Sequence, residues 1–322
     1  MKRFCQLIAF LCRVVVSLLL LVIAVGLAGC GKEPSALDRK AGRLFAVSFQ
    51  TMNNPFFVDL NDGLKQVIEA HGDRLVTLDA RFDSLKQRND ISDVLQQQPA
   101  MIFLNPVNWE GVRGTLLDAQ RKRVPIIVVD TPVSADELVL CQVASDNIGA
   151  GRLAGEALGK IKPAAKVVIL HQSINKACID RVAGFKEAMA EFPQMKLLDT
   201  QEGKGTAEIA RPVMRDLLGR FPECDAAFPI NDPSALGCIS AIESAGKAGQ
   251  VTVVAVDGSR EALAAIKAGK LLGSSAQFPK EIGRIAAERA YEHLAGKTIE
   301  KEVKIPVKFI SAENVDEFLK GP

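Results

Sequence analysis

From residue 43 onward the chain alternates between short apolar runs and longer amphipathic segments, and this alternation limits the folds open to it. Residues 101–104 and 126–129 are continuous apolar runs, which are typical of strands covered on both faces. A helix is expected between them, from about residue 109 to residue 123. Short buried strands separated by amphipathic helices predict parallel sheets with right-handed crossovers, and therefore a doubly wound α/β architecture.

The same alternation covers the rest of the body. Further strands are expected at residues 43–49, 75–78, 167–170, 197–199, 226–228, 251–256 and 273–276. Further helices are expected at residues 55–70, 84–98, 149–160, 177–191, 207–220, 234–245 and 262–268. The pattern starts again after Asp146, and the roughly 290 residues beyond the N-terminal apolar segment exceed one ordinary hydrophobic core. Two α/β units with a cleft between them are therefore predicted.

The N-terminal segment is a separate feature. Three basic residues precede an apolar run at residues 14–28. The last two residues of this run and the two that follow it are Leu27-Ala28-Gly29-Cys30. This arrangement predicts an export signal at residues 1–29, because the run is shorter than the roughly 20 residues that cross a bilayer; an uncleaved signal anchor is the alternative. Leu-Ala-Gly-Cys resembles the lipobox of bacterial lipoproteins, which implies a lipid on Cys30. Residues 30–42 would then be the lipidated residue and a tether.

Charge and cysteine content exclude some functions. The signal removes three of the 40 basic residues and none of the 38 acidic ones, so the remaining chain has a formal charge of −1. Such a chain is not expected to bind nucleic acid, which requires a clustered positive field. The later cysteines show no metal-ligand spacing, so neither a metal nor a cofactor is expected. Buried thiols are predicted, with a Cys224–Cys238 bridge left open.

Polar clusters follow five of the expected strands. They lie at residues 50–57, 130–132, 231–233, 257–259 and 277–279. The carboxyl ends of parallel strands form the binding crevice of such sheets, and amide and carboxylate groups there can hydrogen-bond several hydroxyls of a sugar. Phe56 and Phe57 offer flat apolar faces for a sugar ring. The alternative is that these polar residues only cap helices. Capping alone is disfavoured because the clusters occur at matched positions after five strands.

Six segments together resemble the ribose-type periplasmic sugar-binding proteins. In chain order, they are Asn53-Asn54-Pro55-Phe56-Phe57, Ala144-Ser145-Asp146-Asn147, Arg181-Val182-Ala183-Gly184-Phe185, Asn231-Asp232, Asp257-Gly258 and Gln277-Phe278-Pro279. The resemblance implies a monomeric, two-lobed type I binding fold with a hinge of three crossings, near residues 143–146, 277–278 and 305–306. The N-terminal lobe would be residues 43–145 plus 278–305, and the C-terminal lobe residues 146–277 plus 306–322.

The resemblance also implies a set of ligand-binding residues. Carried over position by position, they are Gln50, Asn54, Phe56, Phe57, Asp130, Arg181, Asn231, Asp257 and Gln277. Arg181 would donate several hydrogen bonds to ligand oxygens; a surface ion pair with Asp180 is the alternative. Both lobes would contact the ligand only when the hinge is closed, so ligand binding would favour closure.

Two positions depart from the ribose-binding pattern. Thr131 stands where ribose-binding relatives carry an arginine, and residues 201–206 lack the aromatic residue found in them. A bidentate donor and a stacking ring are therefore missing, which predicts that ribose itself is not bound tightly. Trp109 could supply the missing ring, but a packing or surface role is favoured.

The sequence contains no recognisable acid–base pair or activated nucleophile, which disfavours an enzyme. We therefore expect an exported receptor, lipid-anchored at Cys30 on the periplasmic face of a membrane, that delivers a sugar or polyol to an ABC permease. Two alternatives stay open. The receptor could present its ligand to a membrane sensor, such as a chemotaxis receptor or histidine kinase, or, less favoured, the protein could process a sugar.

Overall fold

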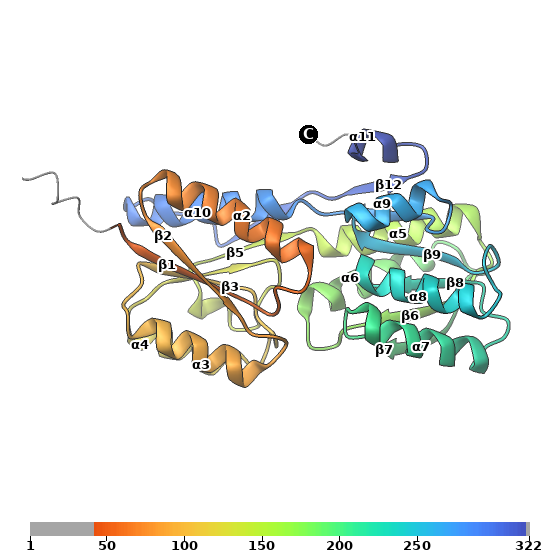
Figure 1. The fold of residues 1–322 in the computed structure, drawn as a ribbon, viewed down its shortest axis with the longest axis horizontal. Coiled ribbons are helices and arrows are strands. Elements are labelled where there is room, and N and C mark those ends of the chain that lie inside the picture. Colours follow the sequence, from red (N-terminus) through yellow and green to blue (C-terminus); the bar gives the residue numbers. More distant parts are fainter. Residues whose placement is uncertain (1–41, 320–322) are drawn as a thin grey trace, which may run out of the picture. The chain divides into compact units, whose positions relative to one another are not determined.

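A computed structural model describes residues 42–319 (Figure 1). The predicted export signal, Cys30 and the tether up to residue 41 lie outside the described residues. Within residues 42–319, every helix is too short or too polar to cross a bilayer. The body consists of two α/β lobes, each built around a six-stranded sheet, so the predicted doubly wound fold is confirmed.

The first sheet has the strand order β11-β5-β4-β3-β1-β2, and all neighbouring strands are parallel. Its strands are β1 (Leu44–Phe49), β2 (Arg74–Asp79), β3 (Met101–Leu104), β4 (Ile126–Val129), β5 (Cys141–Ser145) and β11 (Glu302–Ile305). Its helices are α2 (Pro55–Ala70), α3 (Ser84–Leu95), α4 (Arg113–Arg121) and α10 (Pro279–Leu294), with a 3-10 turn at Asp136–Leu138. Helices α2 and α10 pack on one face and α3 and α4 on the other, so apolar side chains fill both sides (Figure 1).

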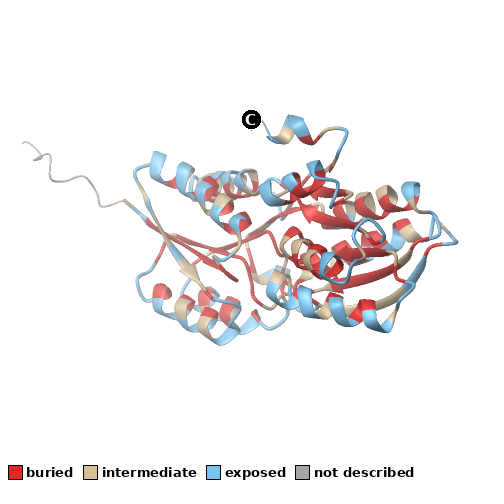
Figure 2. Ribbon diagram, turned by 45° about the vertical axis from the view of Figure 1, so that its right-hand side comes forward, coloured by how far each residue is buried: buried red, intermediate tan, exposed pale blue. Residues whose placement is uncertain are grey.

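The second sheet repeats this order as β12-β10-β9-β8-β6-β7, with only β12 antiparallel to its neighbour. Its strands are β6 (Lys166–His171), β7 (Lys196–Glu202), β8 (Ala226–Pro229), β9 (Thr252–Asp257), β10 (Gly273–Ala276) and β12 (Lys308–Ser311). Its helices are α5 (Asn147–Ile161), α6 (Lys176–Met189), α7 (Ala207–Arg220), α8 (Asp232–Ser244), α9 (Arg260–Lys267) and α11 (Val315–Leu319). The inner strands β6, β8, β9 and β10 are largely buried, whereas the edge strands β7 and β12 and the outer helix faces are partly or fully exposed (Figure 2).

The chain passes between the lobes at three places. Ser145 pairs with Ile305 in the first sheet, and Ala276 pairs with Lys308 in the second. The crossings therefore lie between β5 and α5, between β10 and α10, and between β11 and β12. In each sheet the second strand lies on one side of the first strand, β1 or β6, and the third strand lies on its other side. The binding crevice of such a sheet opens where the strand order reverses in this way. The three crossings bring these two crevices to face each other.

Some element boundaries differ from the expectations. The helix expected from residue 109 begins only at Arg113, because the Asn108 side chain accepts hydrogen bonds from the Glu110 and Gly111 N–H groups and holds a turn. The helix expected to reach residue 98 ends at Leu95, and Gln98 has a left-handed backbone with φ of 50°. Strands β5, β11 and β12 and helices α10 and α11 were not among the expected elements.

The four cysteines in the described part of the chain are Cys141, Cys178, Cys224 and Cys238, and all are buried and free. The expectation of buried thiols is therefore confirmed. Cys224 and Cys238 form no disulfide in the structure, so the bridge that the sequence left open is not present.

Candidate ligand-binding cleft

A cavity lies between the lobes, where the carboxyl ends of both sheets meet. Its empty space is about 320 Å³, part of which is open to solvent. Thirteen residues line it, and they are Gln50, Asn54, Phe56, Phe57, Asp130, Gln172, Asn175, Ala177, Cys178, Arg181, Asn231, Asp257 and Gln277. The structure thus brings all nine of the sequence-predicted binding residues to one cavity wall.

Strand ends position most of the polar wall. Gln50 follows β1, Asp130 follows β4, and Gln277 follows β10, while Asp257 is the last residue of β9. The two carboxylate residues have backbone conformations that side chains rarely adopt, with φ of 66° at Asp130 and 134° at Asp257. Strained backbone of this kind persists where the surrounding structure fixes it, and it gathers at functional sites.

Helix N-termini supply the remaining polar groups. The side-chain oxygen of Asn54 caps α2 by accepting the Phe56 N–H at 3.0 Å, and Asn231 caps α8 by accepting the Ser234 N–H at 3.1 Å. The helix-cap interpretation is therefore right for these two residues. Because each also lines the cavity, capping and ligand contact do not exclude each other here.

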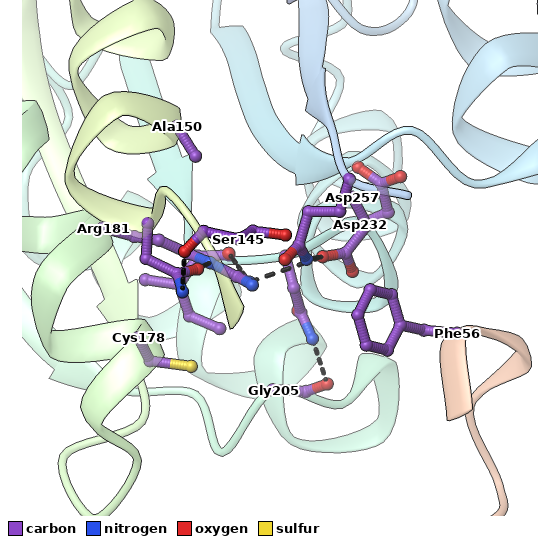
Figure 3. Close-up of polar contacts among 12 residues, drawn as sticks. Phe56, Ser145, Ala150, Cys178, Arg181, Gly205, Asp232 and Asp257 are labelled. Carbon is purple, nitrogen blue, oxygen red and sulfur yellow. Dashed lines mark hydrogen bonds and ion pairs between the residues drawn. The ribbon is translucent and has the colours of Figure 1, made fainter. Parts of the chain in front are cut away.

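Arg181 is buried in the wall, with 4% of its surface exposed. Its Nε donates to Asn147 Oδ1 at 2.9 Å, and its Nη1 donates to the Ile230 carbonyl oxygen at 3.0 Å. Nη1 also lies 3.4 Å from Asp257 Oδ1. In Figure 3, Arg181 and Cys178 lie at the left with Asp257 to their right, and the ring of Phe56 approaches them from the opposite side. The surface pair with Asp180 is not formed, because Asp180 pairs with Lys176.

Three carboxyl groups lie buried in or beside this cavity. Burial raises the pKa of Asp130 to about 6, although the charge of Arg181 opposes this. Burial also raises the pKa of Asp257, again against Arg181. Asp232 lies behind the wall, where it accepts hydrogen bonds from Ser274 Oγ and the Ser259 N–H. Burial and then the charge of Asp257 raise the pKa of Asp232 to about 8. One guanidinium therefore faces an excess of buried acidic groups.

The aromatic part of the wall comes from the start of α2. The rings of Phe56 and Phe57 meet edge to face, with centroids 5.3 Å apart. Phe57 also packs against Phe49 of β1, with centroids 5.6 Å apart. These contacts fix both rings at the cavity, where each can present an apolar surface to a bound molecule.

Direct contacts also join the lobes across the cleft. Asn175 Nδ2 donates to Thr131 Oγ1 at 3.1 Å, and the Trp109 N–H donates to the Ile174 carbonyl oxygen at 3.3 Å. The Lys176 ammonium lies 5.8 Å from the Trp109 ring centroid. Trp109 does not line the cavity, so it does not supply the missing ring there. Thr131, which departs from the ribose-binding pattern, instead joins the lobes.

Four lining residues were missed by sequence reasoning, and they are Gln172, Asn175, Ala177 and Cys178. Gln172 follows β6, so the strand-end argument could have found it. Asn175 caps α6, one turn and a half before Arg181. Ala177 and Cys178 carry no such polar signal. Segment 201–206 approaches this corner, where Asn231 Nδ2 donates to the Gly205 carbonyl oxygen at 2.9 Å.

Comparisons with known proteins agree with this architecture. Residues 45–298 match the family described as periplasmic binding protein domain. The chain is 32% identical over 278 residues to the ribose import binding protein RbsB of Bacillus subtilis, which covers 86% of this chain and 90% of that protein. It is 28% identical over 285 residues to the D-ribose/D-allose-binding protein of Pseudomonas aeruginosa, covering 83% and 88%.

A solved ABC transporter solute binding protein from Agrobacterium vitis, bound with α-D-tagatopyranose, shares the fold. The TM-score is 0.82 at 25% identity, and the match covers 86% of this chain and 97% of that chain. The two sheets of repeated topology, the three crossings and the cavity between the lobes agree with these matches. The chain therefore belongs to the periplasmic binding protein family.

Proposed function

We propose that this protein is a receptor that captures a sugar or polyol between its lobes and delivers it to an ABC transporter. The observation that carries the proposal is the single cavity in which Asn54 and Asp130 of one lobe face Arg181, Asp257 and other polar groups of the second. Several relatives are named as ribose-binding proteins, which supports a polyhydroxylated ligand. Thr131 and residues 201–206 differ from the ribose-binding pattern, which supports a ligand other than ribose.

Hinge closure is the mechanism that fits this arrangement. The proposed N-terminal lobe is residues 43–145 plus 278–305, and the proposed C-terminal lobe is residues 146–277 plus 306–322. A ligand that contacts both lobes stabilises the closed form by its differential affinity for that form. The closed receptor would then dock on the permease as a monomer.

A ligand screen tests the proposed function. Thermal denaturation of the purified protein in the presence of pentoses, hexoses and polyols should reveal ligands that raise the melting temperature, because a ligand that binds only the folded state stabilises it by mass action. Calorimetry would then give the affinity, and ribose should bind more weakly than the best ligand. Failure of all these compounds to bind would contradict the proposed function.

A substitution tests the proposed site. Asp257→Ala should weaken binding of the best ligand by roughly 2–4 kcal/mol, because it removes the carboxylate that pairs with Arg181 and accepts from Gln277 and from ligand hydroxyls. Asp62→Ala, on the exposed face of α2, is the matched control and should bind normally. Near-native affinity of a folded Asp257→Ala protein would exclude this cavity as the site.

We also propose that Cys30 carries a lipid that anchors the exported protein to the periplasmic face of a membrane. The support is the Leu-Ala-Gly-Cys segment after the apolar run. Replacing Cys30 by serine should move the protein from the membrane fraction to the soluble periplasmic fraction or block its processing, and mass spectrometry should find no lipid on it. An unchanged membrane fraction would contradict the lipid anchor.

A further inference from the structure

The charges that line the cavity do not balance. Asp130 and Asp257 line it with carboxylates, whereas Arg181 is the single positively charged residue among its described lining residues. Arg181 lies closest to Asp257, with 3.4 Å between Nη1 and Oδ1, and Asp257 also accepts a hydrogen bond from Gln277 Nε2 at 2.7 Å. Among the carboxylates of the cavity, the Arg181 guanidinium therefore forms its ion pair with Asp257.

Asp130 is the carboxylate without a direct charged partner. Its Oδ2 accepts from Asn105 Nδ2 and from Thr131 Oγ1, each at 2.9 Å, and both donors are neutral. Only 4% of Asp130 is exposed. A buried carboxylate is costly unless it gains both hydrogen bonds and an opposite charge. The two neutral bonds are on one oxygen, and the structure gives no hydrogen-bond partner for Oδ1 among residues 42–319.

Two buried amide oxygens of the same wall have no hydrogen-bond partner in the structure. They are Gln50 Oε1 and Gln277 Oε1, and each residue is 5% exposed. The orientation of Gln277 is fixed because its Nε2 donates to Asp257. Buried polar atoms are rarely left unpaired, so these oxygens point to a ligand that donates hydrogen bonds to them.

We propose that the ligand is an amino-substituted sugar or polyol, whose protonated amine is held by Asp130 and whose hydroxyls donate to the remaining acceptors. This inference rests on the proposed function and narrows its ligand class. A neutral sugar would satisfy the amide oxygens but would leave Asp130 with only the charge of Arg181, which forms its ion pair with Asp257 instead. An ammonium group supplies a full opposite charge together with three donors, whereas a sugar hydroxyl supplies one neutral donor.

Matched pairs of ligands test the inference. Calorimetry at neutral pH should compare galactose with 2-amino-2-deoxygalactose, glucose with 2-amino-2-deoxyglucose, and sorbitol with 1-amino-1-deoxysorbitol. In at least one pair the amine should bind about tenfold more tightly or better, which matches one charge-assisted hydrogen bond. Asp130→Asn keeps the shape and an oxygen for Asn105 and Thr131 but removes the charge, so it should abolish this advantage. Asp62→Asn, at an exposed position, is the control and should keep the tighter binding of the amine.

The possible outcomes separate this inference from the proposed function. Tight binding of neutral compounds, with no advantage for any amine, would overturn the inference and leave the sugar receptor standing. An amine advantage that survives in Asp130→Asn would overturn the role of Asp130. Absence of binding by every compound, neutral or amine, would overturn both. Circular dichroism of each variant shows whether a lost advantage comes from unfolding, because an unfolded Asp130→Asn protein would lose the native spectrum.

Discussion

At the scale of single residues, Asp130 holds a charge where burial opposes it. The groups that face it are the Asn105 amide, the Thr131 hydroxyl, the Arg181 guanidinium, the Asp257 carboxylate and the Cys178 thiol. Burial outweighs the attraction of Arg181, so the pKa of Asp130 is about 6 instead of 3.8. The folded protein therefore binds this proton more tightly than the unfolded chain does, and the associated stability is lost as the pH rises through this range.

Replacing Asp130 by asparagine should stabilise the protein at neutral pH and change little at acidic pH. Well below pH 3.8 the carboxyl is protonated in both states, whereas above its folded-state pKa of about 6 its buried charge is present. A pKa difference of this size corresponds to about 3 kcal/mol as an upper figure. Urea denaturation of both proteins at a series of pH values measures the difference. A stability difference that does not vary with pH would contradict this assignment.

At the scale of elements, glycines set how closely the helix pairs approach. A Cβ at Gly184 of α6 would overlap with the Ile148 carbonyl oxygen of α5, and one at Gly151 of α5 would overlap with the Arg181 carbonyl oxygen. Gly63 of α2 and Gly283 of α10 meet backbone in the same way in the first lobe. The α5–α6 contact matters for the cavity, because α5 begins at Asn147, the residue that holds Arg181 Nε.

Gly184→Ala should therefore destabilise the protein by about 1–3 kcal/mol, the usual cost of overpacking. Gly219→Ala is the matched control, because a Cβ at Gly219 of α7 would meet no atom within 4 Å. Alanine is the better helix former, so this control should be neutral or stabilising by up to about 1 kcal/mol. Urea denaturation compares the two. Equal stability of both variants would show that the α5–α6 distance is not set by Gly184.

The elements differ in how far their sequence could predict them. The strand ends at Asp130, Asp257 and Gln277 could be placed because strand–helix alternation puts all carboxyl ends at one edge. Ala177 and Cys178 could not, because they reach the cavity only through the position of α6 across the cleft. Helix α10 begins at Pro279 and buries mostly small residues, including Gly283 and three alanines, so its apolar period is weak.

At the scale of the whole molecule, the lobes touch through side chains as well as through the three crossings. Thr131 and Asn175 join them on one side of the cleft, and the Trp109 backbone meets Ile174 nearby. Contacts that form only between closed lobes shift the opening equilibrium before any ligand binds. If the ligand binds the closed form, as we propose, its apparent affinity rises with the fraction of closed molecules.

Thr131→Val should shift this equilibrium toward the open form. The substitution keeps the side-chain shape but removes the hydroxyl that accepts from Asn175 across the cleft and donates to Asp130. A net hydrogen bond contributes about 1 kcal/mol. Small-angle scattering without ligand should give a larger radius of gyration, and ligand affinity should fall several-fold while saturating ligand restores the compact form. Thr77→Val, which loses a hydrogen bond to Asn61 within the first lobe, is the control and should scatter like the unaltered protein. An unchanged radius together with unchanged affinity would show that Thr131 and Asn175 do not help to hold the lobes together, and closure would then depend on the ligand and the remaining contacts alone.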